Sequence, residues 1–237
     1  MSTYIISDVH GDLKKFKAAL EKVKFNIAND ELYIIGDLID KGNYSIELIK
    51  LVMANDECIH LLQGNHEFFL MSYLDGTISE RTYISYGGGK TLDQVKKLTD
   101  NEKCEILTFL KGLEVYKVLT KTTGKYLLTH SGLDLDNICW LNENTISVRD
   151  SIELACRKHK LKYLLSTDIH YMSHVKLKKL DHHLIVGHIP CQELNENADY
   201  TVYNGVNYTC IDSGSGTYFK NRKLAVYDLE NELIYYV

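Results

Sequence analysis

The sequence predicts an α/β protein in which two stacked β-sheets form a sandwich with helices on its outer faces. In the first half of the chain, three apolar runs alternate with segments of helical periodicity, a pattern typical of parallel strands joined by right-handed crossovers. In the second half, apolar runs pair across turn residues, as they do in hairpins. A helical segment at residues 148–160 lies between these hairpins. We therefore expect two sheets with helices outside them.

The first half contains three expected strands and two expected helices. The first strand is expected at residues 4–6. Apolar side chains then recur at helical spacing from Leu13 to Val23, which predicts an amphipathic helix that ends near residue 24. The next two strands are expected at residues 32–35 and 59–62, with a helix at residues 45–54 between them.

The rest of the chain divides into a helical middle and a region rich in hairpins. Residues 67–112 lack strand signals and are expected to form helices, broken at Asp75 and Gly76 and at the three glycines from position 87. Asn204 and Gly205 form a dipeptide typical of two-residue hairpin turns. The strands expected here are residues 115–119 with 126–129, 184–187, 200–203 with 206–211, and 223–227 with 233–237.

The composition is that of a globular protein, with 237 residues of which 45% are hydrophobic and 25% charged. A chain of this length can bury one large core, so we expect a single domain over residues 1–237, with two domains as the less favoured alternative. The net charge of -5 argues against nonspecific nucleic-acid binding, which requires a basic face. The six cysteines are scattered and include no CxxC pair, which is typical of a reducing cytosol. Asp8 interrupts the first apolar run and no run reaches about 18 residues, so we expect no signal peptide, no membrane span and a cytoplasmic location.

Five of the expected strands end in side chains that carry oxygen or nitrogen ligand atoms, namely Asp8 and His10, Asp37, Asn65, His130, and His188. Because open α/β sheets bind ligands at the carboxyl ends of their strands, we expect these side chains to converge. The mixture of carboxylate, imidazole and amide suits manganese, iron or zinc better than calcium. We therefore expect two divalent metal ions, with Mn²⁺ favoured. Two adjacent ions favour the hydrolysis of phosphate esters.

The ligands divide between the two ions. Alternate side chains of an extended segment point the same way, so Asp8 and His10 are expected to hold one ion together. Asp37 has two carboxylate oxygens and can bridge both ions. The second ion is expected to bind the Asn65 carbonyl oxygen and the imidazoles of His130 and His188.

His66 and Asp40 are the expected acid pair. A water that bridges two metal ions loses its proton near neutral pH, and the resulting hydroxide can attack phosphorus in line with the leaving oxygen. His66 is the candidate donor of a proton to that oxygen, and Asp40 can hold His66 protonated and oriented. Such acid catalysis is typically worth about 10² to 10⁴ in rate.

Each motif taken alone has a simpler structural interpretation. An Asp-x-His segment is commonly a surface turn, and the segment from Gly36 to Gly42 alone would be a turn that ends a strand. A lone histidine such as His130 or His188 is more often structural, and Glu67 is interpreted as first-turn helix chemistry and not as a ligand. Five such strand ends in this order favour the metal site.

The motifs DVHGD, GDLIDKG and GNHE, followed by a histidine after a strand and by VGHIP, resemble those of the calcineurin-like metallophosphoesterases. The similarity is greatest to the phosphoprotein phosphatase branch, which includes small bacterial and phage serine/threonine phosphatases. Bacterial symmetrical dinucleoside tetraphosphatases share the pattern. The resemblance covers nearly the whole chain and implies a four-layer αββα sandwich. It also implies the assignments above, with Asp8, His10 and Asp37 at one metal, Asp37, Asn65, His130 and His188 at the other, and His66 and Asp40 as the acid pair.

The chain departs from the family pattern at arginines that grip the substrate phosphate. Lys41 stands where one of them is usual, and it is the expected substrate-binding residue, although it lacks the bidentate fork of arginine. Gln63 replaces a second arginine and loses the charge. A third arginine is absent from residues 164–168, where Arg149 or Arg157 could substitute for it.

We predict a metal-dependent phosphomonoesterase, a serine/threonine protein phosphatase that acts on a phosphoprotein or a small phosphorylated substrate. The alternative is a symmetrical dinucleoside tetraphosphate hydrolase. A third hypothesis, an inactive metal-bound binding module, would explain Gln63, but such a module has no need of an intact acid pair. Lys90 is expected near the cleft, although Gly89-Lys90-Thr91 is no P-loop because Ile84 stands where the first glycine would be.

Overall fold

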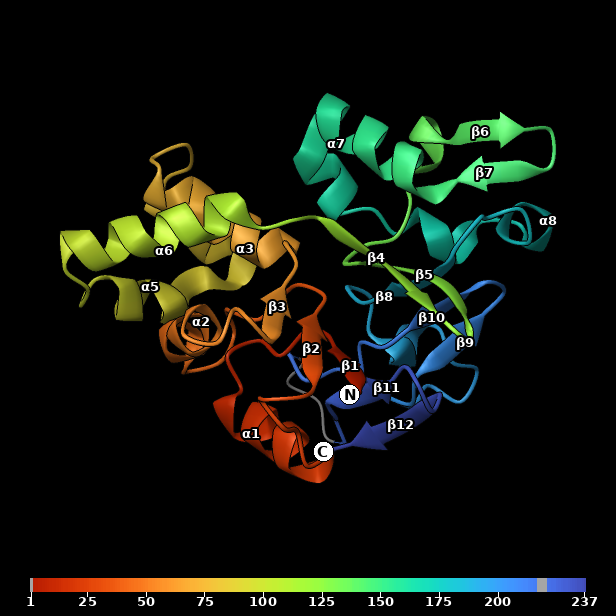
Figure 1. The fold of residues 1–237 in the computed structure, drawn as a ribbon. Coiled ribbons are helices and arrows are strands. Elements are labelled where there is room, and N and C mark those ends of the chain that lie inside the picture. The colour runs from red at the N-terminus through yellow and green to blue at the C-terminus, as the bar shows by residue number, and fades with distance from the viewer. Residues whose placement is uncertain (1, 217–220) are drawn as a thin grey trace.

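The fold is a sandwich of two five-stranded sheets with helices outside both (Figure 1). The structure is a computed structural model that describes residues 2–216 and 221–237. The helices of the first half of the chain cover one sheet, and α7 lies over the other (Figure 1). This arrangement confirms the predicted layers.

The first sheet has the strand order β12-β11-β1-β2-β3. Its first three strands in the chain pair in parallel, as the alternation of strands and helices predicts. The two carboxyl-terminal strands add to it in antiparallel fashion. The strands are β1 (Thr3–Ile6), β2 (Glu31–Ile34), β3 (Ile59–Leu61), β11 (Ala225–Asp228) and β12 (Leu233–Tyr236).

The second sheet has the order β4-β5-β8-β10-β9. Its three central strands are parallel, and each edge strand pairs antiparallel with its neighbour. The two sheets together thus hold six parallel strands, three in each. The strands are β4 (Tyr116–Lys121), β5 (Gly124–Thr129), β8 (His183–Val186), β9 (Tyr203–Gly205) and β10 (Tyr208–Cys210).

Period-two alternation of the strands builds three layers of core. Ile5 of β1 packs in the cluster between the sheets, whereas its neighbour Ile6 packs beneath the helices of the first sheet. On the second sheet, Ile185 of β8 faces inward and Leu184 faces the outer layer. Both faces of each sheet are therefore apolar, and the central strands are continuous apolar runs.

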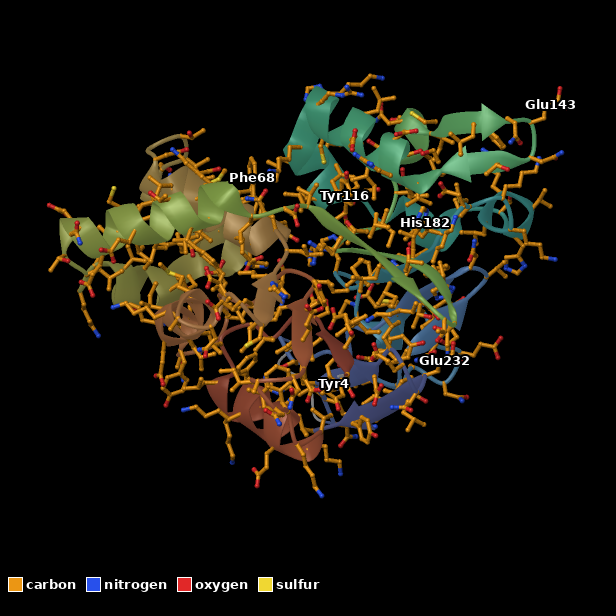
Figure 2. The ribbon with its side chains drawn as sticks, in the orientation of Figure 1. Tyr4, Phe68, Tyr116, Glu143, His182 and Glu232 are labelled. Atoms are coloured by element: carbon orange, nitrogen blue, oxygen red, sulfur yellow. The ribbon has the colours of Figure 1, made fainter. Side chains whose placement is uncertain are left out.

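The helices seal the outer faces of the sheets. Phe68 of α3 packs against both outer cores and lies at the junction of the two helical layers (Figure 2). No helix in the described ranges is long and apolar enough to cross a membrane. The first sheet is covered by α1 (Leu13–Lys22), α2 (Ser45–Met53), α3 (Asn65–Leu74), α4 (Glu80–Tyr83), a π-helical turn (Ile84–Gly88), α5 (Gly89–Val95) and α6 (Asp100–Gly112). The second is covered by α7 (Val148–Leu164), α8 (His174–Leu177) and the hairpin β6 (Cys139–Asn142)–β7 (Thr145–Ser147).

The structure differs from the sequence prediction in two hairpins. Asn204 and Gly205 lie inside β9, and the turn consists of the next two residues, of which Asn207 has a positive φ of 59°. Asparagine tolerates this conformation, so the turn shifts by two residues toward the carboxyl end. The β6–β7 hairpin was not predicted, because Trp140 and Leu141 are exposed and the strand lacks alternating burial.

Candidate metal centre

All six predicted ligand residues lie just beyond the carboxyl ends of parallel strands. Asp8 and His10 follow β1, and Asp37 follows β2. The other three are Asn65, which opens α3 after β3, His130, which follows β5, and His188, which follows β8. The structure therefore brings together side chains from both sheets.

Asp37 lies at the centre of this cluster. Its Oδ2 atom is 3.7 Å from His10 Nε2, and its Oδ1 atom is 3.4 Å from His130 Nε2. Ligand atoms of Asp37, His130 and His188 lie within 4.8 Å of one another, and those of His10, Asp37 and His66 form a second such group. Asp37 belongs to both groups, which is the position that a bridging ligand requires.

Asp8 and Asn65 complete the two sides of the cluster. Asp8 Oδ1 lies 3.8 Å from His10 Nε2, and Asn65 Oδ1 lies 2.9 Å from His130 Nε2. The other Asp8 oxygen accepts hydrogen bonds from the Ser7 hydroxyl and from the His188 backbone N–H (3.1 Å). Asp8 thus links the end of β1 to the end of β8 in the opposite sheet.

The backbone around these ligands is in the left-handed region. The φ angles are 53° at Asp8, 51° at His10, 53° at Asp37 and 71° at His188. The expectation that Asp8 and His10 alternate in an extended segment is therefore wrong, because the chain turns as soon as β1 ends. Such conformations cost roughly 1–3 kcal/mol each and cluster at functional sites.

Backbone carbonyl groups orient His10 and His130, and burial disfavours the charged form of His10 and of His188. The Nδ1 atoms of His10 and His130 lie 3.0 Å from the carbonyl oxygens of Ile39 and Ile35, so Nδ1–H donates and Nε2 faces the cluster. Burial lowers the pKa of His10 well below its ordinary value. Burial, with repulsion from His130, lowers the pKa of His188 to about 3. Neutral imidazole is the form that binds metal.

The buried carboxylates of the cluster lie close together, so positive charge between them would be stabilising. Burial raises the pKa of Asp37, but the neighbouring histidines, His130 foremost, outweigh burial and lower it below its usual range. Burial and the charge of Asp37 raise the pKa of Asp8. Asp212, which follows β10, has a pKa raised by burial and by Asp8. Divalent cations would relieve this repulsion, so the donor set fits them.

The two residues of the predicted acid pair, His66 and Asp40, are hydrogen-bonded to each other. His66 Nδ1 lies 2.7 Å from Asp40 Oδ2, and the Tyr83 hydroxyl donates to Asp40 Oδ1 at 2.6 Å. Burial lowers the pKa of His66, but the Asp37 carboxylate and the hydrogen bond to Asp40 outweigh it, so the pKa is raised. The protonated imidazole is thus favoured next to the cluster, with Nε2 3.8 Å from Asp37 Oδ2.

Glu67 does more than its interpretation as a first-turn residue suggested. It accepts the N–H of Gly64 at the start of α3 (2.9 Å), as a helix-capping glutamate does. It also accepts the N–H groups of Asp37 (2.8 Å) and Leu38 (2.9 Å). Glu67 therefore fixes the loop that carries Asp37, a role that the sequence did not reveal.

Some of the residues considered for phosphate binding lie at the cluster, and others lie elsewhere. Lys41 is there, with Nζ 2.9 Å from His10 Nε2. Gln63 is buried and donates to the Leu110 carbonyl oxygen (3.3 Å), on the side of α3 and α6. Arg149 pairs with Glu153 on the surface of α7, where Arg157 is also exposed.

A cavity of about 280 Å³ adjoins His10. Lys41 and Lys90 line it, so Lys90 lies where it was expected. Arg222 also lines the cavity and was not predicted, since no motif surrounds it. Three basic side chains therefore line a cavity that adjoins His10 of the cluster.

The calcineurin-like phosphoesterase family matches residues 1–211. The chain belongs to this family. The resemblance predicted from the motifs is thereby confirmed: the chain is a metal-dependent phosphoesterase by family, and its clustered histidines and aspartate fit a metal site.

Two relatives are symmetrical bis(5'-nucleosyl)-tetraphosphatases. That of Erwinia tasmaniensis is 30% identical over 134 residues, which is 56% of this chain and 45% of the relative. That of Buchnera aphidicola is 32% identical over 133 residues, with the same coverage. The matched segment thus spans less than half of the length of either relative.

The fold is shared with solved phosphatases. A protein serine/threonine phosphatase from Saccharomyces cerevisiae, similar to human phosphatase PP5, matches 97% of this chain and 73% of its own with a TM-score of 0.61. The two sequences are 14% identical. This likeness confirms the calcineurin-like phosphoesterase fold.

Proposed function

We propose that this calcineurin-like phosphoesterase is a hydrolase that uses two divalent metal ions and His66 as its general acid. The observation that carries the proposal is the position of Asp37, whose carboxylate lies near His10 on one side and near His130 and His188 on the other, with His66 beside it. Asp8, His10 and Asp37 would hold one ion, and Asp37, Asn65, His130 and His188 the other. The ligand chemistry favours Mn²⁺, with iron or zinc as alternatives. Bound ions would supply an activated water and neutralise charge on the phosphate.

The side chains of the chain supply the proton. Because His66 Nδ1 is held by Asp40, the Nε2 proton faces the cluster and is available to the oxygen that leaves phosphorus. Asp40 is fully buried and accepts from Tyr83, which keeps its carboxylate in place. Lys41 provides a positive charge for the phosphate, as the family pattern implies.

For the substrate, we now place dinucleoside polyphosphates ahead of phosphoproteins. The relatives of about 30% identity act on such nucleotides, whereas the likeness to protein phosphatases extends to the fold alone. The basic cavity beside His10 also suits a substrate with several phosphates. The phosphoprotein hypothesis stays the second candidate, since the metal and acid residues serve either substrate.

One series of assays tests both the proposed substrate and the proposed role of His66. With Mn²⁺, the protein should hydrolyse diadenosine tetraphosphate, and comparison with a phosphoserine peptide and an aryl phosphate ranks the substrates. His66→Asn should lower kcat about 10²- to 10⁴-fold. Calorimetry should show that this variant still takes up Mn²⁺. Faster hydrolysis of the peptide would restore the phosphoprotein hypothesis, and absence of turnover with Mn²⁺, Fe²⁺ and Zn²⁺ would favour the inactive binding module.

A further inference from the structure

The cavity beside His10 has a lining that suits an anion. Its basic side chains, Lys41, Lys90 and Arg222, come from three separate segments: the loop after β2, helix α5 and the segment before β11. Among the described residues of the lining, Asp12 is the only carboxylate. Asp12 already caps α1, where it accepts the Lys15 N–H at 3.1 Å. The lining therefore carries an excess of positive charge.

The size and polarity of the cavity limit what it can hold. Its volume of about 280 Å³ lies below the range of roughly 300–1,000 Å³ that is typical of pockets for drug-sized ligands. Apart from Tyr44, the remaining lining residues are glycines or small polar residues: Gly11, Gly42, Asn43, Ser215 and Gly216. Such a space accommodates a compact charged group and not a nucleobase in addition.

The cavity borders the proposed metal centre at His10. His10 lines the cavity and also lies 3.7 Å from Asp37 at the middle of the cluster. Lys41 stands at the boundary, in contact with His10 Nε2. Lys90 is exposed, and its ammonium has no hydrogen bond or ion pair with the residues that the structure describes. Lys41 and Lys90 therefore bring positive charge to a cavity that borders the cluster.

We propose that Lys90 and Arg222 form a binding site for a second phosphate group of the substrate, adjacent to the phosphate that is hydrolysed. This inference rests on the proposed function and deepens it, since the site selects a polyphosphate chain over a phosphate monoester. Lys90 and Arg222 would supply positive charge for the substrate, which the uncharged Gln63 and the arginines on the surface of α7 do not supply. Charge-assisted contacts to phosphate oxygens are the expected interaction.

Binding of inorganic tripolyphosphate to the metal-free protein tests the site without any requirement for activity. In calorimetry at low salt, Lys90→Ala and Arg222→Ala should each weaken the affinity about 10-fold. Lys178→Ala and Arg157→Ala, at exposed positions after α8 and on α7, remove the same charges elsewhere and should leave the affinity within about twofold of wild type. Equal weakening by the control variants, or wild-type affinity in the cavity variants, would overturn the proposal.

A kinetic comparison then links the site to selectivity. With Mn²⁺, the ratio of kcat/KM for diadenosine tetraphosphate to that for an aryl phosphate should fall about 10-fold in Lys90→Ala and in Arg222→Ala. An unchanged ratio would contradict a role in selecting polyphosphates. If the wild-type protein hydrolyses neither compound, the proposed function fails, while the tripolyphosphate titration still decides whether the cavity binds phosphate.

Discussion

Tyr83 extends the hydrogen-bonded pair of His66 and Asp40 to three side chains. Its hydroxyl and the His66 imidazole bind opposite oxygens of the Asp40 carboxylate, at 2.6 and 2.7 Å. Two contacts hold the Tyr83 ring in place. Gly88 packs so closely against the ring that a Cβ at that position would lie 2.3 Å from it, and the Tyr73 ring stacks on it with centroids 5.4 Å apart. At the residue scale, the orientation of His66 therefore depends on a hydroxyl 43 positions from Asp40.

Tyr83→Phe should lower kcat about 10-fold and leave KM within about twofold, because Asp40 loses a strong donor and holds His66 less firmly. Steady-state rates on an aryl phosphate measure this effect. Tyr73→Phe is the matched control, since it removes a hydroxyl from the stacked ring and keeps the hydrogen bond to Asp40. A rate in Tyr83→Phe equal to that of the control would show that Tyr83 serves packing alone.

A second prediction at the residue scale concerns His170 and the pH dependence of the free energy of unfolding. Burial lowers the pKa of His170 to about 4 from its ordinary 6.5. The folded state therefore stays neutral there while the unfolded state binds a proton, so the free energy of unfolding falls as pH drops from about 6.5 to 4, by on the order of 2–3 kcal/mol. Urea unfolding of the metal-free protein and of His170→Gln across this range should show a steeper loss in wild type. Parallel pH profiles would refute the assignment.

Close contacts between elements, more than the strands themselves, set the geometry of the site. The turn after β8 passes so near to the end of β1 that a Cβ at Gly187 would lie 1.9 Å from Ser7 Oγ and 2.3 Å from Asp8 Oδ2. Only glycine allows this approach, which also brings the His188 N–H to Asp8. The contact that joins the two sheets at their ligand-bearing ends therefore has the backbone of Gly187 on one side and the side chains of Ser7 and Asp8 on the other.

Gly187→Ala should displace the Asp8 carboxylate and weaken Mn²⁺ uptake at least about 10-fold, with a loss of stability of roughly 1–3 kcal/mol from the steric conflict. Calorimetric titration and urea unfolding measure the two effects. Gly112→Ala is the control, because a Cβ there meets nothing within 4 Å. Wild-type metal affinity in Gly187→Ala would mean that the Asp8 position is not critical.

The elements also show what the sequence could predict. Asp8, Asp37 and His188 were predictable because each lies two or three residues past the end of an apolar strand, so the local pattern places it at the sheet edge. Tyr83 and Glu67 were not, since the residues that they bind lie 43 and about 30 positions away and no local pattern marks those contacts. The β9–β10 turn was misplaced for a related reason: pairing with β8 selects the register, which outweighs the turn preference of Asn204 and Gly205.

At the scale of the whole molecule, the proposed metal centre joins two halves that are otherwise packed by apolar side chains. Asp8 and Asp37 follow strands of the first sheet, and His130 and His188 follow strands of the second. The sheets meet through an apolar cluster that includes Ile5, and the polar residues gather at one edge of it. Ligands from both sheets around shared ions would oppose separation of the halves.

Mn²⁺ should therefore stabilise the whole fold, by about 2.7 kcal/mol per site at a free concentration 100 times the Kd, because only the folded chain assembles the ligands. Thermal unfolding with Mn²⁺ and with a chelator measures the difference. In Asp8→Asn and His188→Gln, Mn²⁺ should raise the stability less than it does in wild type. In Asp37→Asn, most of this stabilisation should be lost, since Asp37 belongs to both ligand groups. His174→Gln, an exposed histidine of α8, should keep all of it. If Asp37→Asn were stabilised by Mn²⁺ as much as wild type, the ions would bind elsewhere, and the bridging role of Asp37 would be wrong.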